Sequence, residues 1–447
     1  MDPRCPMLVV TLPAARAGDP AAFVREARDR GARLIEIRCD LTPGVMPFDA
    51  DLPLLFSPRG GPLQSGLREG VDALDLDPAL DGEHARETVD ASFLVRSFHD
   101  HKGTPDEQEL LRTGRELRRR GAALVKLAVT PGSYEQLGVL DRVREQLAKD
   151  GPVTVHAMGP LAELERARSP WRNAWTYARF DASAESAPGQ LDLAHYQALT
   201  GPAEPAVFGV AGSTEAVQRS GGPALHSRLL REQGVCATYL RFPVCDPEVD
   251  FRALAELGVR GLSVTTPAKL AAYRFAASHD ENARAAESAN TLLFGAPSRA
   301  LQLDSQGLVR GYPQLAGLGP VSVVGTGGVV PSVLLAGREL GWRDITLFGR
   351  DAARAEALTQ RFGTPFKPLE KLGEHTAQLI VWCLPLDRPD LDLPEGKGSA
   401  LDLRYGAATE FLERAAAAGR IPYDGQAMFE AQARAQSAAF LAALGAS

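Results

Sequence analysis

Short apolar runs alternate with amphipathic stretches throughout the first 200 residues of the chain. Apolar runs of this length are typical of buried strands, and eight of them lie at 7–14, 32–40, 52–59, 70–77, 92–100, 123–129, 152–159 and 175–181. The segments 20–31 and 106–121 repeat apolar residues every three or four positions and end at glycine, which is typical of helices. Eight strands alternating with helices predict an α/β fold, a compact (β/α)8 TIM barrel over residues 1–200. A doubly wound sheet is the alternative for this half.

The pattern is interrupted at 199–206, where proline and glycine gather, and a second alternation of strands and helices follows. This alternation predicts a second α/β unit over residues 206–310. From 318 to 406 the chain has the order strand, glycine turn, helix and second strand, which is typical of a Rossmann dinucleotide-binding domain. The alanine-rich tail, 407–445, is predicted to be mostly helical and to return to the 206–310 unit.

Composition narrows the class of protein. With 447 residues, of which 45% are hydrophobic, the chain is long enough for two or three domains. Its net charge of −7, without any basic block, argues against a nucleic-acid partner. We find no run of about 18 apolar residues that would predict a membrane span, and no pattern typical of a signal peptide at residues 1–15. The five cysteines show neither CxxC pairing nor zinc spacing, so we expect a reduced, cytoplasmic protein without a metal site.

Lysine is rare in this sequence, since only seven of the 49 basic residues are lysines. One of them, Lys126, interrupts the apolar run 123–129, where a parallel barrel strand is buried on both faces. An ammonium group is costly there unless it is paired or deprotonated. One interpretation is a lysine whose stem reaches solvent at the strand end. The other is an amine with a lowered pKa that forms a Schiff base with a carbonyl substrate.

Other polar residues stand near the ends of neighbouring predicted strands. Glu36 and Arg38 alternate along one run and therefore point to the same face of that strand. Arg59 closes the run 52–59, and His99 lies near the end of another run. Because active sites of TIM barrels lie at the carboxyl ends of the strands, we expect these side chains to converge at that mouth.

Five motifs follow one another in this half of the chain. They are E-x-R at 36–38, a histidine and an acid followed by T-P at 99–105, V-K-x-A at 125–128, M-G at 158–159 with a closing Arg166, and S-A-P-G-Q at 186–190. Through them the first half resembles type I 3-dehydroquinate dehydratase over nearly its whole length. The resemblance agrees with the predicted barrel and adds an expected activity.

The resemblance implies dehydration of 3-dehydroquinate. Lys126 would form an imine with the ketone, and His99 would remove the neighbouring proton and return one to the departing hydroxyl. Arg166 would pair with the substrate carboxylate. The residues that would hold the hydroxyls are Glu36, Arg38, Arg59, Ser186 and Gln190. The family's glutamate that follows the matching arginine and orients the histidine is absent here, and the candidates to replace it are Glu69, Asp72 and Asp75.

The glycine turn of the Rossmann segment is G-T-G-G-V-V-P at 325–331. Gly325, Gly327 and Gly328 would let backbone N–H groups approach a pyrophosphate at the helix N-terminus. Close packing of strand and helix is the alternative interpretation. Arg350 and Arg354 follow the next predicted strand, and arginine in this place favours a 2′-phosphate and hence NADP over NAD.

A second set of motifs extends from about residue 206 to the end of the chain. It comprises V-T-x-P-x-K at 264–269, S-A-N-T at 288–291, Q-L-D at 302–304, and D-G-x-x-M-x-x-x-Q at 424–432 with Tyr405 before it. This half resembles shikimate dehydrogenase. The resemblance implies that Lys269 and Asp304 form a catalytic pair while NADPH reduces the ketone of 3-dehydroshikimate. The residues that would hold the substrate are Ser220, Thr265, Asn290, Tyr405 and Gln432.

Three motifs of the second half depart from that family. Its S-x-S-P is Ser220-Gly221-Gly222-Pro223 here, its N-R-T is Gly349-Arg350-Asp351, and its N-A-T is Trp382-Cys383-Leu384. The favoured hypothesis is a bifunctional enzyme that performs both reactions. One alternative is an active dehydratase with a degenerate reductase-like domain, and another is a metabolite-sensing regulator without catalysis. The expected partners are 3-dehydroquinate, 3-dehydroshikimate and shikimate, with a homodimer left open and neither nucleic acid nor membrane.

Overall fold

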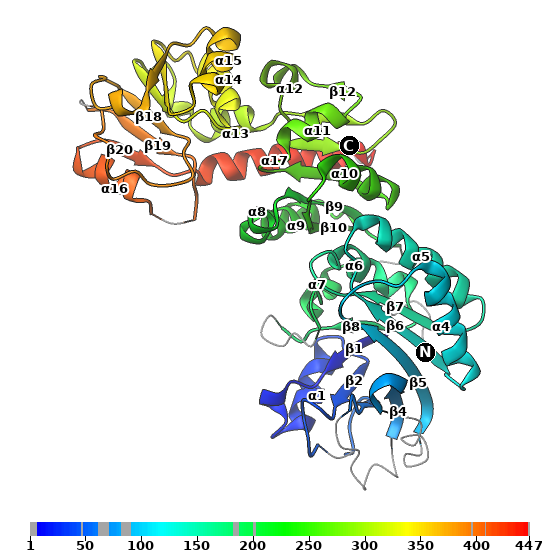
Figure 1. Ribbon diagram of the computed structural model, residues 1–447. Helices are drawn as coiled ribbons and strands as arrows, with labels where there is room; N and C mark the ends of the chain where they lie inside the picture. The colour runs from blue at the N-terminus through cyan, green and yellow to red at the C-terminus, as the bar shows by residue number, and fades with distance from the viewer. Residues whose placement is uncertain are drawn as a thin grey trace. The chain divides into compact units, whose positions relative to one another are not determined.

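The computed structural model describes residues 7–45, 48–60, 71–81, 91–181, 187–199, 203–394, 397–406 and 408–445. The chain forms two compact units, the first made mainly of residues 1–207 and the second mainly of residues 208–447. Both units are built from strands and helices in alternation (Figure 1). Among the described residues, no helix is both long and apolar enough to cross a membrane.

The first unit contains a sheet of eight parallel strands in the order β7-β6-β5-β4-β3-β2-β1-β8. The strands are β1 (Leu8–Thr11), β2 (Leu34–Arg38), β3 (Leu54–Ser57), β4 (Val71–Leu76), β5 (Ala91–Asp100), β6 (Leu124–Val129), β7 (Val153–Ala157) and β8 (Thr176–Ala178). The order follows the chain, and β1 pairs in parallel with both β2 and β8. The predicted TIM-like barrel is therefore confirmed, and the doubly wound alternative for this half is wrong.

Helices follow most of these strands. They are α1 (Pro20–Asp29), α2 (Pro78–Asp81), α4 (Glu107–Arg119), α5 (Tyr134–Ala148), α6 (Glu163–Arg172) and α7 (Leu193–Ala198), with a 3-10 turn η1 (Ala14–Arg16). The carboxylates of Asp19, Asp106 and Asp192 accept backbone N–H groups at the starts of α1, α4 and α7, which satisfies donors that the helix leaves unpaired. Gly114 lets α4 pack closely on α5, because a Cβ there would lie 2.4 Å from Leu147.

The second unit begins with a six-stranded mixed sheet in the order β10-β9-β11-β13-β14-β12. Its strands are β9 (Ala206–Gly212), β10 (Ala237–Pro243), β11 (Val259–Val264), β12 (Ser278–His279), β13 (Thr291–Leu293) and β14 (Arg299–Leu301). The helices of this segment are α8 (Thr214–Arg219), α9 (Gly222–Glu232), α10 (Pro247–Glu256), α11 (Lys269–Phe275), α12 (Glu281–Ala286) and α13 (Asp304–Gly311), followed by η2 (Pro313–Leu315).

A parallel sheet in the order β17-β16-β15-β18-β19-β20 completes this unit. Its strands are β15 (Val321–Val324), β16 (Ile345–Gly349), β17 (Phe366–Pro368), β18 (Leu379–Trp382), β19 (Ser399–Asp402) and β20 (Ile421–Tyr423). The remaining helices are α14 (Val330–Glu339), α15 (Ala352–Phe362), η3 (Leu369–Lys371), α16 (Glu410–Ala417) and α17 (Gln426–Ala443). Because this strand order starts in the middle and proceeds outward in both directions, it is that of a Rossmann fold, and the predicted Rossmann domain is confirmed.

The long helix α17 packs against α9, α13 and β11, whereas α16 packs against β19 and β20. The contact with α13 is close because Gly307 has no side chain, and a Cβ there would lie 2.7 Å from Cβ of Gln432. Further along α17, Phe440 stacks on Phe208 of β9 with ring centroids 4.7 Å apart. The last helix is thus anchored to elements of the 206–310 segment.

Candidate functional site

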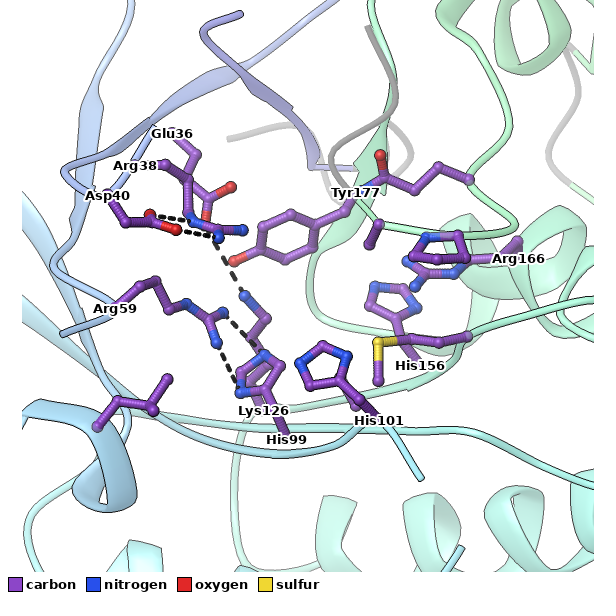
Figure 2. A pocket seen from close by; sticks show the side chains of 16 residues that line it. Glu36, Arg38, Asp40, Arg59, His99, His101, Lys126, His156, Arg166 and Tyr177 are labelled. Atoms are coloured by element: carbon purple, nitrogen blue, oxygen red, sulfur yellow. Dashed lines mark hydrogen bonds and ion pairs between the residues drawn. The ribbon is translucent and has the colours of Figure 1, made fainter. Parts of the chain in front are cut away.

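A cavity of about 190 Å³ lies at the carboxyl ends of the barrel strands (Figure 2). Seven of the residues selected from the sequence line it together: Glu36, Arg38, Arg59, His99, Lys126, Arg166 and Gln190. Ser186, which was also selected, lies outside the described residues. The cavity is further lined by residues that were not selected, among them Asp40, His101, His156, Met158 and Tyr177.

Lys126 lies inside the barrel on strand β6, with only 4% of its surface exposed. Its Nζ is 2.9 Å from Oδ2 of Asp75 and 3.9 Å from Oε1 of Glu36. The same nitrogen lies 3.9 Å from the centre of the Tyr177 ring. Burial lowers the pKa of Lys126 below its ordinary value, although the charge of Asp75 opposes this. The side chain is therefore held within the barrel instead of reaching solvent at the strand end.

Glu36 faces the same interior from β2. Its carboxylate accepts hydrogen bonds from Oγ1 of Thr11 at 2.6 Å and from Oγ of Ser57 at 2.8 Å. Burial raises the pKa of Glu36, but the charges of Lys126 and Arg38 outweigh this and hold it below its ordinary value. Glu36 is therefore a buried anion that Thr11 and Ser57 fix in place.

His99 is oriented by Asp77, because its Nδ1 lies 2.8 Å from Oδ2 of that carboxylate. Neither of the two candidates that the structure describes, Asp72 and Asp75, takes this role. Asp75 pairs with Lys126, Asp72 accepts the backbone N–H of Leu54, and Glu69 lies outside the described residues. The assignment to Asp72 or Asp75 is therefore corrected to Asp77, which follows β4 directly.

Nδ1 of His99 faces both Asp77 and Arg59, while Nη2 of Arg59 lies 2.8 Å from Nε2 of His99. Burial lowers the pKa of His99 to about 4, and the charges of Arg59 and Lys126 act in the same direction while Asp77 opposes them. His99 is therefore neutral at pH 7. A neutral imidazole that donates Nδ1–H to a carboxylate offers its Nε2 lone pair as a base.

Arg59 is one of three described non-glycine residues with a left-handed backbone, at φ 55°. This conformation costs a side-chain-bearing residue roughly 1–2 kcal/mol. It accompanies a nearly buried side chain, 8% exposed, whose guanidinium lies 3.6 Å from Asp75 and 3.9 Å from Asp77. Backbone strain of this kind is typical of residues whose side chain a functional site requires.

The two last motifs of the barrel meet at its mouth. The backbone N–H of Gly159 donates to the carbonyl of Pro188 at 3.0 Å. A Cβ at Gly189 would lie 2.7 Å from the carbonyl oxygen of Gly159, so glycine is required for this approach. Beside them Arg166 on α6 is 2% exposed, and its Nε donates to the carbonyl of Ala157 at 2.8 Å. A buried guanidinium in a cavity is a strong donor to a carboxylate ligand.

A second cluster of hydrogen-bonded polar side chains lies in the other unit. Nζ of Lys269, the first residue of α11, is 2.5 Å from Oδ2 of Asp304, the first residue of α13. The other carboxylate oxygen accepts Nδ2 of Asn290 at 2.7 Å. Asn290 is in turn fixed by Thr291 and by the backbone N–H of Leu303, which both donate to its Oδ1 at 2.9 Å. The residues selected as a catalytic pair and as one substrate ligand are therefore in direct contact.

The other residues selected in this unit are placed by neighbouring elements. Thr265 follows β11, and its backbone N–H donates to the carbonyl of Ala211 at 2.8 Å. The hydroxyl of Ser220 accepts the N–H of Gly222 at 3.1 Å, and the neighbouring Gly221 lies against Tyr405 and Phe429. The rings of Tyr405 and Phe429 are stacked with centroids 4.3 Å apart. Oε1 of Gln432, on α17, has no hydrogen-bond partner among the described residues.

The glycine turn joins β15 to α14. Gly325 has φ 129°, and a Cβ there would lie 3.2 Å from Cys383, so this position requires glycine for close packing. A Cβ at Gly327 or Gly328 would meet no described atom within 4 Å, which leaves the turn open toward a ligand. Packing thus explains the first glycine, and the other two are free to approach a pyrophosphate.

Arg350 and Arg354 both lie on the surface beyond β16. Arg354 forms an ion pair with Asp351 at 3.2 Å, and the same carboxylate accepts the N–H of Arg354 at the start of α15. Within the described part of the chain, no group of three or more histidines, cysteines or acids is arranged to hold a metal ion, and the four described cysteines are free thiols.

Residues 61–200 match the family model of type I 3-dehydroquinase, and residues 213–292 match that of the shikimate dehydrogenase substrate binding domain. The shikimate dehydrogenase (NADP(+)) of Xanthomonas euvesicatoria pv. vesicatoria is 31% identical over 250 residues, which span 51% of this chain and 87% of that protein. The chain belongs to the shikimate dehydrogenase family. It carries a type I 3-dehydroquinase domain in addition.

Two further relatives cover the dehydroquinase domain. The shikimate biosynthesis protein AroDE of Chlamydia pneumoniae is 29% identical over 385 residues, or 82% of this chain and 77% of that protein. The 3-dehydroquinate dehydratase of Methanosarcina acetivorans is 28% identical over 209 residues, or 39% of this chain and 86% of that protein. Because the match to the chlamydial protein spans 82% of this chain, it extends over both of the units described above.

Sequence patterns missed three buried residues of the dehydroquinase cavity region. Asp77 stands two residues after Asp75 in V-D-A-L-D-L-D, so period-two alternation placed both on one face and was a usable signal. His156 and Tyr177 also occupy apolar strands, β7 and β8. A polar residue inside such a strand is the signal that singled out Lys126, and it applies equally to them.

Proposed function

We propose that the chain is a bifunctional enzyme, which dehydrates 3-dehydroquinate to 3-dehydroshikimate in the barrel and reduces 3-dehydroshikimate to shikimate with NADPH in the second unit. The observation that supports the first activity is the position of Lys126. Its side chain is buried, lines the cavity and contacts both Asp75 and the Tyr177 ring. An amine in that position is protected from solvent and has a lowered pKa, which are the conditions for a Schiff-base nucleophile.

In the dehydration, Lys126 first loses its proton to water, which its lowered pKa favours. The resulting neutral amine attacks the ketone, and water leaves to give an imine. His99 then takes the proton from the carbon next to the imine, and the hydroxyl at the far end of the resulting enamine leaves with a proton from His99. Water finally hydrolyses the imine, so that the net change is loss of one water molecule. Arg59 must leave Nε2 of His99 before this step, and a substrate hydroxyl is a suitable new partner for its guanidinium. Arg166 pairs with the carboxylate.

The pH dependence of dehydration tests the role of His99. Its pKa of about 4 means that the free enzyme holds it neutral at pH 7. Protonation of His99 therefore leaves kcat/KM unchanged as pH falls through 6.5 and lowers it only as pH approaches 4. Asp77→Asn removes the hydrogen bond that raises this pKa and fixes the tautomer, and we expect kcat to drop about 10- to 100-fold. The measurement is a pH–rate profile of both proteins, and a decline centred near 6.5 in the unmodified chain would contradict this role.

In the reduction, NADPH supplies the hydride when it is bound. The chain's own contribution is the pair Lys269 and Asp304, which delivers a proton to the oxygen of the ketone as it becomes a hydroxyl. The residues Ser220, Thr265, Asn290, Tyr405 and Gln432 bind the ring hydroxyls and the carboxylate. The buried Oε1 of Gln432, without a described partner, fits a substrate hydroxyl as its donor.

Cofactor choice is assigned to Arg350 and Arg354, with Gly325, Gly327 and Gly328 at the pyrophosphate. Because Arg354 is paired with Asp351, Arg350 is expected to make the larger contribution to a 2′-phosphate. Arg350→Ala should raise the KM for NADP⁺ about tenfold, the scale of one charge-assisted hydrogen bond, and leave the KM for NAD⁺ within twofold. Steady-state kinetics with both cofactors measure this, with Arg361→Ala as a surface control, and equal changes for both cofactors would refute it.

One experiment separates the three hypotheses for the whole chain. 3-Dehydroquinate and NADPH are supplied together, and 3-dehydroshikimate and shikimate are measured over time. A bifunctional enzyme forms shikimate, whereas a dehydratase with a degenerate second unit accumulates 3-dehydroshikimate. A regulator forms neither product.

The proposed domain boundaries are 1–200 for the dehydratase, 206–310 together with α17 for substrate binding, and 318–406 together with α16 and β20 for NADP. The expectation that all helices of 407–445 return to the 206–310 unit is corrected, because α16 packs against β19 and β20 of the Rossmann sheet. A cytoplasmic location and a homodimer stay predictions.

A further inference from the structure

His156 is a buried polar residue of the dehydroquinase cavity to which the proposed reaction gives no task. It lies on β7, is 1% exposed and lines the cavity together with Lys126 and Arg166. Its Nδ1 is 3.3 Å from Oε2 of Glu165. Its Nε2 has no hydrogen-bond partner among the residues that the structure describes. A buried ring nitrogen without a partner is costly unless a ligand or water completes it.

The partners of Glu165 determine which nitrogen of His156 carries the proton. The carboxylate accepts the backbone N–H of Ala157 at 3.0 Å and Nδ2 of Asn173 at 3.1 Å. Burial raises the pKa of Glu165, but His156 and Arg166 outweigh this and hold it below its ordinary value. Nδ2 of Asn173 also lies 3.4 Å from Nδ1 of His156. Its two hydrogens, however, are donated at shorter distances to the carbonyl of Val155 and to Glu165. An ionised Glu165 therefore accepts the proton of Nδ1, so Nε2 presents a lone pair. Burial also lowers the pKa of His156 to about 4, which keeps the ring neutral.

His156 lies beside Arg166 at one end of the cavity. Nε of Arg166 is 3.9 Å from the same Oε2 of Glu165 and donates to the carbonyl of Ala157, the residue next to His156. In Figure 2 these two side chains lie on the side of Lys126 away from Arg59. His156 and Arg166 thus share Glu165 as a partner at this end of the cavity. In the sheet, His99 and His156 both pair with Ala128 of β6, so the two histidines are level across that strand and face the same ligand.

The ring of Tyr177 relates His156 to the reactive amine. His156 meets this ring edge-on with centroids 5.7 Å apart, and Nζ of Lys126 lies 3.9 Å from its centre. In the sheet, His156 of β7 pairs with Ala128 of β6. Ala128 is two residues after Lys126 on the same strand, so Lys126 and His156 project to the same face of the sheet. A ligand with one six-membered ring that contacts both Lys126 and Arg166 would therefore also lie next to His156.

We propose that His156 and Arg166 form a subsite for an α-hydroxy carboxylate. Arg166 binds the carboxylate, and Nε2 of His156 accepts a hydrogen bond from the hydroxyl on the adjoining carbon. The inference rests on the proposed function, because 3-dehydroquinate carries a hydroxyl and its carboxylate on one carbon and dehydration removes that hydroxyl. The product leaves Nε2 without its donor again, so His156 favours substrate over product in this site.

Competitive inhibition of the dehydration by two ligands tests this subsite. Quinate has the α-hydroxy carboxylate, whereas shikimate has a carboxylate on a double bond and no hydroxyl there. Because the assay follows dehydration, it reports binding in the barrel alone. His156→Leu should raise the inhibition constant of quinate about tenfold, the scale of one hydrogen bond, and leave that of shikimate within twofold. His156→Gln, whose amide oxygen can accept the same hydrogen bond, should recover part of the difference.

Met158 provides the matched control, since it lines the same cavity without a polar group. Met158→Leu should leave the ratio of the two inhibition constants unchanged. If His156→Leu weakens quinate and shikimate equally, His156 only supports the structure and the subsite is refuted. If the unmodified chain does not dehydrate at all, the proposed function fails, and calorimetric titration of quinate into the unmodified and His156→Leu chains then decides the subsite alone. Equal affinities in that titration would overturn it.

Discussion

Replacing Lys126 with arginine is expected to abolish dehydration while the chain continues to oxidise shikimate. Arginine keeps a positive charge near Asp75, which is 2.9 Å from the amine in the unmodified chain, but it cannot be deprotonated to form an imine. We expect the rate to fall roughly 10⁴-fold or more, the scale seen when an enzyme loses its covalent nucleophile. Dehydration is measured by the absorbance of the conjugated product, and shikimate oxidation by that of NADPH.

Chemical trapping of the imine tests the same prediction and identifies the lysine that forms it. Borohydride added with 3-dehydroquinate should leave a mass adduct on the peptide that contains Lys126, and Lys126→Arg should show none. Alanine is a poorer choice for this test, because it leaves Asp75 buried without its nearest cation, at a cost of roughly 3–5 kcal/mol. An adduct on another lysine, or none on folded protein with authentic substrate, would contradict the Schiff base.

The second large effect is expected at Lys269, whose amine is 2.5 Å from Asp304. Lys269→Met or Asp304→Asn should lower kcat for shikimate oxidation about 10²- to 10⁴-fold, because each removes half of the pair that moves the proton. Dehydration by the same protein should stay within twofold, since the barrel is a separate unit. Steady-state assays of both reactions on one preparation measure this.

Lys371 offers a matched control for the lysine of this pair. It lies on the surface of the same unit, in an ion pair with Glu374, and Lys371→Met should change neither reaction. A loss at Lys269 that appears in KM alone, with kcat unchanged, would assign this lysine to substrate binding and remove it from proton transfer.

The fold was accessible from the sequence because its signals are local. Each of the eight apolar runs coincides with one barrel strand to within a few residues. Parallel strands are buried on both faces, so a plain hydrophobic run suffices to locate them. The glycine turn at 325–331 likewise has its place between β15 and α14. Such patterns depend on neighbours in the chain and need no knowledge of long-range contacts.

The partners within the site were less accessible, because they depend on register between strands. Alternation put Asp75 and Asp77 on one face of β4, but the pairing of β4 with β5 and of β5 with β6 decides which of them meets Lys126 and which meets His99. The same holds for His156, whose partner Glu165 comes from helix α6 across a loop. Sequence reasoning therefore selected residues that line one cavity and missed the groups that orient them.

The left-handed backbone of Arg59 has a consequence for engineering this enzyme. At φ 55° glycine would relieve roughly 1–2 kcal/mol of backbone strain, but Arg59→Gly is not expected to raise the melting temperature. The same change deletes the guanidinium that lies against Asp75, Asp77 and His99. Removing the cation from buried ion pairs costs roughly 3–5 kcal/mol, which exceeds the strain that glycine would relieve. A library sorted on melting temperature is therefore expected to retain arginine at position 59 despite its strained backbone.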